Sequence, residues 1–177
     1  YRGEIVEPLD EGEAYDVARV LRKRDVKAVA VCFINSYING EHERRMAEIL
    51  SEVLGPDVAV TTSHETHPEI FEDDRFSTTV ANTILAPIIR PYARDLDRRT
   101  SAAGYDADVL LLHSGGGVMT PATADKYAAR LAASGIAAGA IASKYFAGLC
   151  GYDNSIGLDM GGTSADISLA ENGQLRV

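Results

Sequence analysis

The sequence has few cysteines and no motif in which cysteines act together. Its 177 residues include two, Cys32 and Cys150, and no CxxC or mixed Cys/His pattern is present. Neither a disulfide framework nor a zinc site is therefore indicated. Because each cysteine lies in an apolar stretch, we expect both to be small buried core residues.

Basic charge and long apolar runs are also scarce. The 17 lysines and arginines are outnumbered by 26 acidic residues, which gives a net charge of -9. This balance argues against a nucleic-acid-binding module, since such modules depend on basic surfaces. No apolar run reaches membrane-spanning length and no signal peptide is visible, so no membrane contact is expected and the cytoplasm is the expected location.

The first part of the chain alternates between helical and strand patterns. Amphipathic periodicity predicts helices over residues 11–23 and 41–53, and apolar runs predict strands over 27–34 and 58–62. Near-continuous apolar strands are typical of parallel sheets covered on both faces. The alternation therefore predicts an α/β fold.

A long helix and a buried strand are expected next. Ser77 is a suitable N-cap for a helix that reaches about Ala103, and Pro87 and Pro91 should kink or break it. Residues 109–112 then read as a buried strand. Thr120-Pro121 gives an N-cap followed by proline at the first helical position.

The last part combines a Gly/Ala-rich helix, expected over 134–150, with a β-hairpin. Its strands are predicted at 156–160 and 165–170, and Asn172-Gly173 favours a further tight turn. Small side chains on the helix permit close packing, and its start at Ser134-Gly135 favours anions. The alternative for this helix is a tightly packed interior element.

The turn between these two strands has the composition of a phosphate-binding loop. Glycines let backbone N–H groups approach a phosphate, hydroxyls add donors, and carboxylates at the strand ends can hold hydrated Mg²⁺. The alternative is an ordinary tight hairpin. The candidate phosphate-binding residues are Gly161, Gly162, Thr163 and Ser164, and the candidate Mg²⁺ ligands, acting through water, are Asp159 and Asp166.

This combination resembles the hydantoinase A/5-oxoprolinase family, which includes acetone and acetophenone carboxylase subunits and belongs to the actin, sugar-kinase and heat-shock chaperone superfamily. The resemblance rests on Asp159-Met160-Gly161-Gly162-Thr163-Ser164-Ala165-Asp166, on Pro68-Glu69-Ile70 followed by Ser77-Thr78-Thr79-Val80-Ala81-Asn82, and on residues 28–50 and 114–119.

The resemblance implies a ribonuclease H-like (actin-like ATPase) lobe with a parallel-rich central sheet, followed by the first β-hairpin of a second lobe. Residues 1–133 would form the first lobe's α/β part, 134–151 the connecting helix, and 152–177 the phosphate-loop hairpin. No first Gly-Gly-Thr loop precedes Tyr1. We therefore expect this to be the second loop of a cleft, completed by further segments or a partner subunit, and the isolated fragment to be inactive.

The implied activity is ATP-dependent hydrolysis of a cyclic amide or carboxylation of a ketone, with ATP and Mg²⁺ as cofactors and a hydantoinase B-type subunit or domain as partner. Asp159 and Asp166 would be the catalytic residues, and Ser134 and Gly135 would join the turn in binding the nucleotide. The alternatives are a kinase-like phosphotransferase and a non-catalytic, nucleotide-regulated assembly module.

The implied substrate contacts are Glu69, Arg75, Asn82, His113 and Ser114. The spacing of His64 and His67 is one residue too short for a metalloprotease HExxH motif, and Pro68 would interrupt the helix. A metal role for His64, His67 and Glu69 stays open beside a solvated acidic loop. Asn82 also fits a helix-capping role, and His113 fits a buried structural one.

Overall fold

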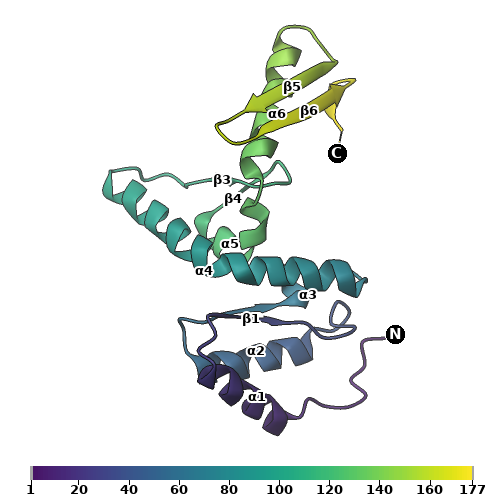
Figure 1. Ribbon diagram of the computed structural model, residues 1–177, viewed down its shortest axis with the longest axis vertical. Helices are drawn as coiled ribbons and strands as arrows, with labels where there is room; N and C mark the ends of the chain where they lie inside the picture. Colours follow the sequence, from purple (N-terminus) through teal and green to yellow (C-terminus); the bar gives the residue numbers. More distant parts are fainter. Residues whose placement is uncertain (1, 177) are drawn as a thin grey trace.

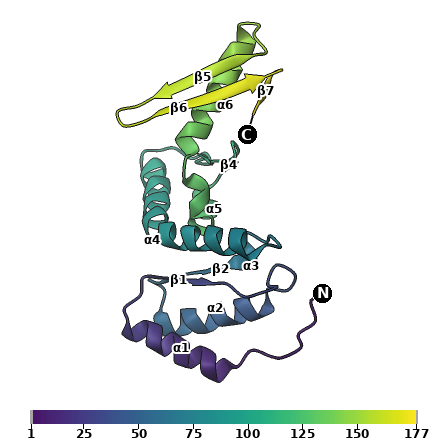
Figure 2. The same ribbon diagram turned by 45° about the vertical axis from the view of Figure 1, so that its right-hand side comes forward.

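The structure is a computed structural model that describes residues 2–176, with residue 125 described in its backbone alone. Figures 1 and 2 show an elongated stack of layers. The N-terminal helices lie at one end, a long helix crosses the middle, and a helix with a β-hairpin lies at the other end. The α/β composition predicted from the sequence is confirmed.

The N-terminal layer consists of two helices beneath a parallel strand pair. The helices are α1 (Glu11–Lys23) and α2 (Glu41–Leu54), and the strands are β1 (Ala28–Val31) and β2 (Ala59–Thr62). The pairing runs in parallel register from Ala28↔Ala59 to Val31↔Thr62. The apolar faces of both helices meet the strands in one core of buried side chains: Ala14, Ala18, Val31, Met46, Ile49 and Leu50.

A buried carboxylate joins this layer to the short helix α3 (Ser63–Thr66). Glu43 is fully buried and accepts hydrogen bonds from Phe33 N (2.7 Å), Ser63 Oγ (2.6 Å) and His64 N (2.8 Å), and its Oε2 lies 2.9 Å from His64 Nδ1. Burial raises the pKa of Glu43, but hydrogen bonds from Ser63, the two amides and the imidazole together bring it below its usual value.

The imidazole of His64 lies against the backbone of Gly40, the residue before α2. A Cβ built at position 40 would lie 2.1 Å from His64 Cδ2, so no side chain fits there while the ring keeps this position. The observed position of the His64 ring therefore requires glycine at position 40.

The central helix α4 (Glu72–Ala102) packs across β1 and β2 on the side opposite α1 and α2. It begins after Phe71, so the expectation that Ser77 caps it was wrong. Its first turn holds Glu72, Asp73 and Asp74, which the positive end of a helix stabilises. Ser77 lies inside the helix, where its Oγ donates to Asp73 O at 2.6 Å.

The prolines do not break α4. Pro87 and Pro91 lie inside one continuous helix, whose ribbon bends part-way along (Figures 1 and 2). A bend is what proline causes when it removes a backbone donor and crowds the preceding turn. The C-terminal part of α4 thereby turns along the next layer.

That next layer is built from short elements. They are β3 (Leu111–Leu112), β4 (Val118–Met119), α5 (Pro121–Lys126) and the 3-10 helix η1 (Ala128–Leu131). β3 is shorter than the predicted strand and pairs antiparallel with β4. Thr120 caps α5 as predicted, since its Oγ1 accepts from Thr123 N at 3.3 Å.

The C-terminal layer is a hairpin packed on the Gly/Ala-rich helix. It comprises α6 (Ser134–Leu149), β5 (Ser155–Met160), β6 (Ala165–Glu171) and β7 (Gln174–Leu175). Asn172 and Gly173 have φ angles of 52° and 70°, as the predicted tight turn requires.

Two expectations fail. Neither cysteine is the buried core residue that was expected, because Cys32 is half-buried and Cys150, which follows α6, is exposed. The strands that the structure describes form three separate sheets, and only β1 and β2 pair in parallel, so these residues do not form a parallel-rich central sheet. Over residues 2–176, no helix is both long and apolar enough to cross a membrane.

Candidate functional site

The predicted phosphate loop is the turn between β5 and β6. Asp159 and Asp166 are direct cross-strand partners, and Met160 pairs with Ala165 beyond them. The turn is closed by one hydrogen bond, from Gly161 N to Ser164 O at 3.0 Å. Because directly opposed residues share one face of a hairpin, the two carboxylates lie side by side at the entrance to the turn.

This face of the hairpin rests on α6. A Cβ built at Gly139 would lie 3.0 Å from Asp159 Oδ2, and one built at Gly157 would lie 2.6 Å from Ser143 Oγ. Small residues on both elements therefore permit the close approach. The Gly/Ala-rich helix serves to place a strand and its carboxylate, and among the described residues none in α6 is buried.

The turn itself is open. A Cβ at Gly161 or Gly162 would meet nothing within 4 Å, and neither glycine has a positive φ. The start of α6 is similarly open at Gly135, where a Cβ would also meet nothing within 4 Å. Ser134 follows Ala133, which adopts the left-handed conformation with φ of 58°. The backbone at both places is thus free of side-chain crowding, while the Gly161 N–H is engaged within the turn.

The opposite face of the hairpin is an exposed apolar surface, which we call the hairpin apolar face. It is formed by alternating residues of β5 and β6, whose neighbours in sequence face α6. Its members are Ile156, Leu158, Met160, Ile167 and Leu169, with exposed fractions from 46% to 76%. A contiguous surface of this kind is typical of an interface.

A second candidate site lies between α3, α4 and the β3–β4 turn. We call it the histidine pocket: it has a volume of about 410 Å³, and its lining includes His67, Asn82, His113, Ser114, Tyr127 and Arg130. Three of the five predicted substrate contacts, Asn82, His113 and Ser114, are thus brought together. The volume falls within the range of small-molecule pockets, about 300–1,000 Å³.

His113 is seated on the glycine run that follows it. Its Nδ1 accepts a hydrogen bond from Gly115 N at 3.0 Å. A Cβ at Gly115 would lie 3.0 Å from the ring's Cε1, and one at Gly117 would lie 2.7 Å from Nε2. The glycines therefore make room for the imidazole, and the accepting Nδ1 leaves the proton of the neutral ring on Nε2.

Asn82 builds the pocket wall through hydrogen bonds to two backbone groups. Its Nδ2 donates to Lys126 O at 3.0 Å, and its Oδ1 accepts from Ala129 N at 2.9 Å. The side chain is almost fully buried and both its polar atoms are occupied. Asn82 thus fixes the segment that carries Tyr127 and Arg130 to α4.

Arg75 and Glu69 do not line the pocket. Arg75 is fully buried, and its guanidinium donates to the carbonyl oxygens of Glu69 (2.5 Å), Ile70 (3.2 Å) and Phe33 (3.3 Å). The Glu69 side chain is exposed beside it. In this arrangement Arg75 holds the α3–α4 connection against the segment that follows β1.

Comparison with known proteins places this geometry in a family. Residues 75–177 match the family model described as hydantoinase/oxoprolinase, and residues 1–54 match that of the hydantoinase/oxoprolinase N-terminal region. The chain belongs to the hydantoinase/oxoprolinase family.

Similar proteins within the family include curated sequences and solved structures. The chain is 35% identical to the caprolactamase subunit alpha of Pseudomonas jessenii over 97% of its own length and 25% of the relative's. The acetophenone carboxylase gamma subunit of Aromatoleum aromaticum is 32% identical over 98% of this chain and 24% of the relative. The nucleotide-free structure of acetone carboxylase superimposes with a TM-score of 0.87 at 30% identity, covering 97% of this chain and 24% of that one. The chain thus spans about a quarter of the length of these relatives.

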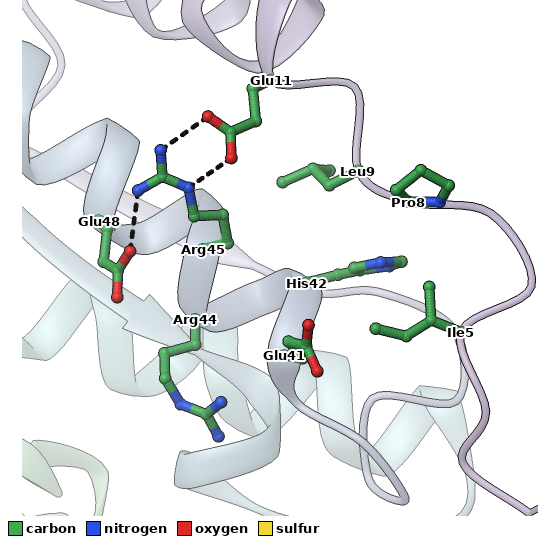
Figure 3. Close-up of a pocket in the computed structure, with 9 residues that line it drawn as sticks. All are labelled: Ile5, Pro8, Leu9, Glu11, Glu41, His42, Arg44, Arg45 and Glu48. Carbon is green, nitrogen blue, oxygen red and sulfur yellow. Dashed lines mark hydrogen bonds and ion pairs between the residues drawn. The ribbon is translucent and has the colours of Figure 1, made fainter.

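One further cavity in this hydantoinase/oxoprolinase chain lies between the N-terminal arm and α2 (Figure 3). Its central ion pairs join Arg45 to two acidic residues: the guanidinium donates to both oxygens of Glu11 at 2.7 Å and to Glu48 at 3.0 Å. These bonds raise the pKa of Arg45, and the bond from Arg45 lowers that of Glu11. No residue predicted from the sequence lies there, so we assign it no function.

The two metal sites considered from the sequence, one at His64, His67 and Glu69 and one at Asp159 and Asp166, differ in the structure. Over the part of the chain that the structure describes, no three His, Cys, Asp or Glu side chains cluster as a metal site would require. His64 is held by Glu43 and His67 lines the histidine pocket, so these two do not act together. Asp159 and Asp166 remain as a pair of carboxylates, the donor set that a hydrated Mg²⁺ prefers.

Tyr127 and Arg130 are pocket residues that no motif in the sequence marks. They reach the pocket because α5 ends at Lys126 and the chain turns through η1, where Asn82 holds it. The only signal for their position is this contact across the fold, which a local pattern does not carry.

Proposed function

We propose that the chain is part of an ATP-dependent hydantoinase/oxoprolinase-type enzyme that couples ATP hydrolysis to opening of a cyclic amide or carboxylation of a ketone. The β5–β6 turn would supply the second phosphate loop of a ribonuclease H-like ATPase cleft. The observation that carries the proposal is the direct pairing of Asp159 with Asp166 at an open Gly-Gly-Thr-Ser turn.

Two opposed carboxylates repel each other, and the register of the hairpin holds these two face to face. A Mg²⁺ held through water by Asp159 and Asp166 would relieve this repulsion and offset charge on the phosphoryl group of bound ATP. Gly162 and Thr163 would orient that group through backbone and hydroxyl donors, and Gly161 would hold the turn in shape through its bond to Ser164 O. The start of α6 at Ser134-Gly135 would add N–H groups.

The remaining walls of the cleft would come from elsewhere in a longer protein or assembly. In this proposal residues 1–133 belong to the first lobe, 134–151 connect the lobes, and 152–177 begin the second. The hairpin apolar face supports this, because a further segment or a hydantoinase B-type subunit would cover it. The relatives named above as alpha and gamma subunits are consistent with such an assembly.

The local claim is tested by paramagnetic broadening. Mn²⁺ with ATP, added to the ¹⁵N-labelled chain, should broaden the amide signals of residues 159–166 before any others. Asp159→Asn should remove this effect, while Asp153→Asn, at an exposed site before β5, should leave it intact. Broadening that begins elsewhere, or that survives Asp159→Asn, would refute the assigned site.

The coupled reaction is tested in a chimera. This chain would replace its matching segment in the caprolactamase subunit alpha, assembled with its partner, and caprolactam-dependent ATP hydrolysis would be measured. We expect the chimera to hydrolyse ATP when caprolactam is present. We expect the same chimera with Asp166→Asn to lose this activity. Full activity in that variant, with the folded state verified by circular dichroism, would remove the carboxylate from the proposed machinery.

A further inference from the structure

We infer that the histidine pocket binds a small oxyanion: a carboxylate, hydrogencarbonate or phosphate group. The chain as a whole is acidic, with a net charge of -9. Among the residues described, however, the lining of this pocket contains Arg130, His67 and His113 and no carboxylate. A local excess of donors in an acidic protein points to a negatively charged ligand.

Arg130 is the free positive charge of the pocket. Its guanidinium lies 5.0 Å from the centre of the Tyr127 ring and makes no ion pair with any described residue. The neighbouring Lys126 differs, because its Nζ is bound to Glu65 Oε2 at 3.1 Å. Tyr127 thus holds the guanidinium in place through its ring face and leaves all five of its N–H groups for a ligand.

His113 adds a directed donor. Since Nδ1 accepts from Gly115 N, the neutral ring carries its proton on Nε2, and the ring lines the pocket. The ring of His67 likewise makes no hydrogen bond within the described chain and lies open to the pocket. The Asn82 amide is occupied, so recognition falls to Arg130 and the two imidazoles.

A cation does not fit the same position. Arg130 would repel it, and the two imidazoles have no third ligand among the described residues. An oxyanion instead accepts from a guanidinium and an imidazole N–H at once, which is the geometry that carboxylate and phosphate groups favour.

Helix α6 packs against both the histidine pocket and the phosphate loop. A Cβ at Gly116, in the turn that seats His113, would lie 3.0 Å from Ile141 Cδ1, while Gly139 faces Asp159. A substrate or product carboxylate in the pocket would therefore sit beside the helix that positions Asp159. This role in catalysis rests on the proposed function, whereas anion binding itself does not.

The test is an NMR titration of the ring nitrogens of the four histidines, without ATP. Acetate, hydrogencarbonate and phosphate would each be added at constant ionic strength, with chloride as the control. We expect saturable shifts of His113 and His67, while His42 and His64, which lie outside the pocket, serve as internal references. The arm that saturates at the lowest concentration identifies the carboxylate or phosphate source.

Three variants make the result decisive. Arg130→Gln should weaken binding at least tenfold, and Arg24→Gln, at an exposed arginine after α1, should not change it. His113→Asn keeps an acceptor for Gly115 N but removes the Nε2–H donor, so it should retain the fold and lose affinity. Shifts that are not saturable, that are equal for all four histidines, or that survive Arg130→Gln would overturn the inference.

Discussion

Gly139 of α6 and Asp159 of β5 lie so close that a side chain at position 139 would press on the Asp159 carboxylate. A Cβ there would lie 3.0 Å from Asp159 Oδ2 and 3.5 Å from Asp159 Cβ. A residue outside the phosphate loop therefore limits the space available to the proposed Mg²⁺ ligand.

Replacing Gly139 should displace this carboxylate. In Gly139→Val the branched side chain would push β5 away from α6, and Mn²⁺/ATP broadening of residues 159–166 should weaken severalfold. The matched control is Gly148→Val in the same helix, where a Cβ meets nothing within 4 Å. Equal behaviour of the two variants would show that Gly139 does not position Asp159.

Glu43 should make stability depend on pH. Its pKa in the folded protein is lower than the ordinary glutamate value of 4.5, so its contribution is present above that value and is lost as the pH falls through the lowered pKa. Glu43→Gln should cost about 1–3 kcal/mol of unfolding free energy at neutral pH, because donors lose a charged partner.

Urea unfolding at pH 7 and below pH 4 measures this difference. The difference in unfolding free energy between wild type and Glu43→Gln should become smaller at the lower pH, because the wild-type carboxyl becomes protonated there. Glu48→Gln, exposed on the same helix, should show little effect at either pH. A gap that is constant or widens on acidification would contradict the assignment of a charged Glu43.

Removing the Asn82 amide should loosen the pocket wall. Asn82→Ala leaves Lys126 O and Ala129 N without their partner and should cost about 1–3 kcal/mol in thermal or urea unfolding. Asn82→Asp keeps the acceptor for Ala129 N. It should therefore shift the NMR signals of the Tyr127 ring less than Asn82→Ala does. Val80→Ala, at an exposed site on the same helix, is the control; an equal loss there would show that the amide has no special part.

The two cysteines should react at different rates. Cys150 is exposed, whereas burial, followed by the nearby Glu43, raises the pKa of the half-buried Cys32. A disulfide reagent at pH 8 should label one thiol quickly and the second slowly, and the slow phase should accelerate in denaturant. Cys150→Ser should abolish the fast phase, and a fast phase in that variant would reverse the assignment.

The sequence predicted correctly those helices and turns whose ends depend on residues close by in the sequence. The α1 boundaries and the Asn172-Gly173 turn are of this kind, since each depends on nearby caps or backbone angles. Ser77 failed as a cap because three acidic residues upstream make a more favourable first turn for α4.

The candidate sites divide in the same way. The phosphate loop was found because Asp159 and Asp166 flank it in sequence, and their register follows from the hairpin. The histidine pocket needed the fold, because the packing of η1 against α4 brings Arg130 to the pocket that His67 also lines. Arg75 was assigned to a substrate by resemblance, and its burial beneath backbone carbonyls depends on a contact with Phe33 O, after β1, that no motif encodes.

The match between Gly40 and His64 also restricts the order in which these two positions can change. With the imidazole in place, a Cβ at position 40 would lie 2.1 Å from the ring, so any side chain there is excluded. A lineage that first exchanges His64 for a smaller residue becomes free to vary position 40, at the expense of one hydrogen bond to Glu43. Replacing Gly40 first would require the imidazole to leave its place beside Glu43, so the glycine depends on the histidine.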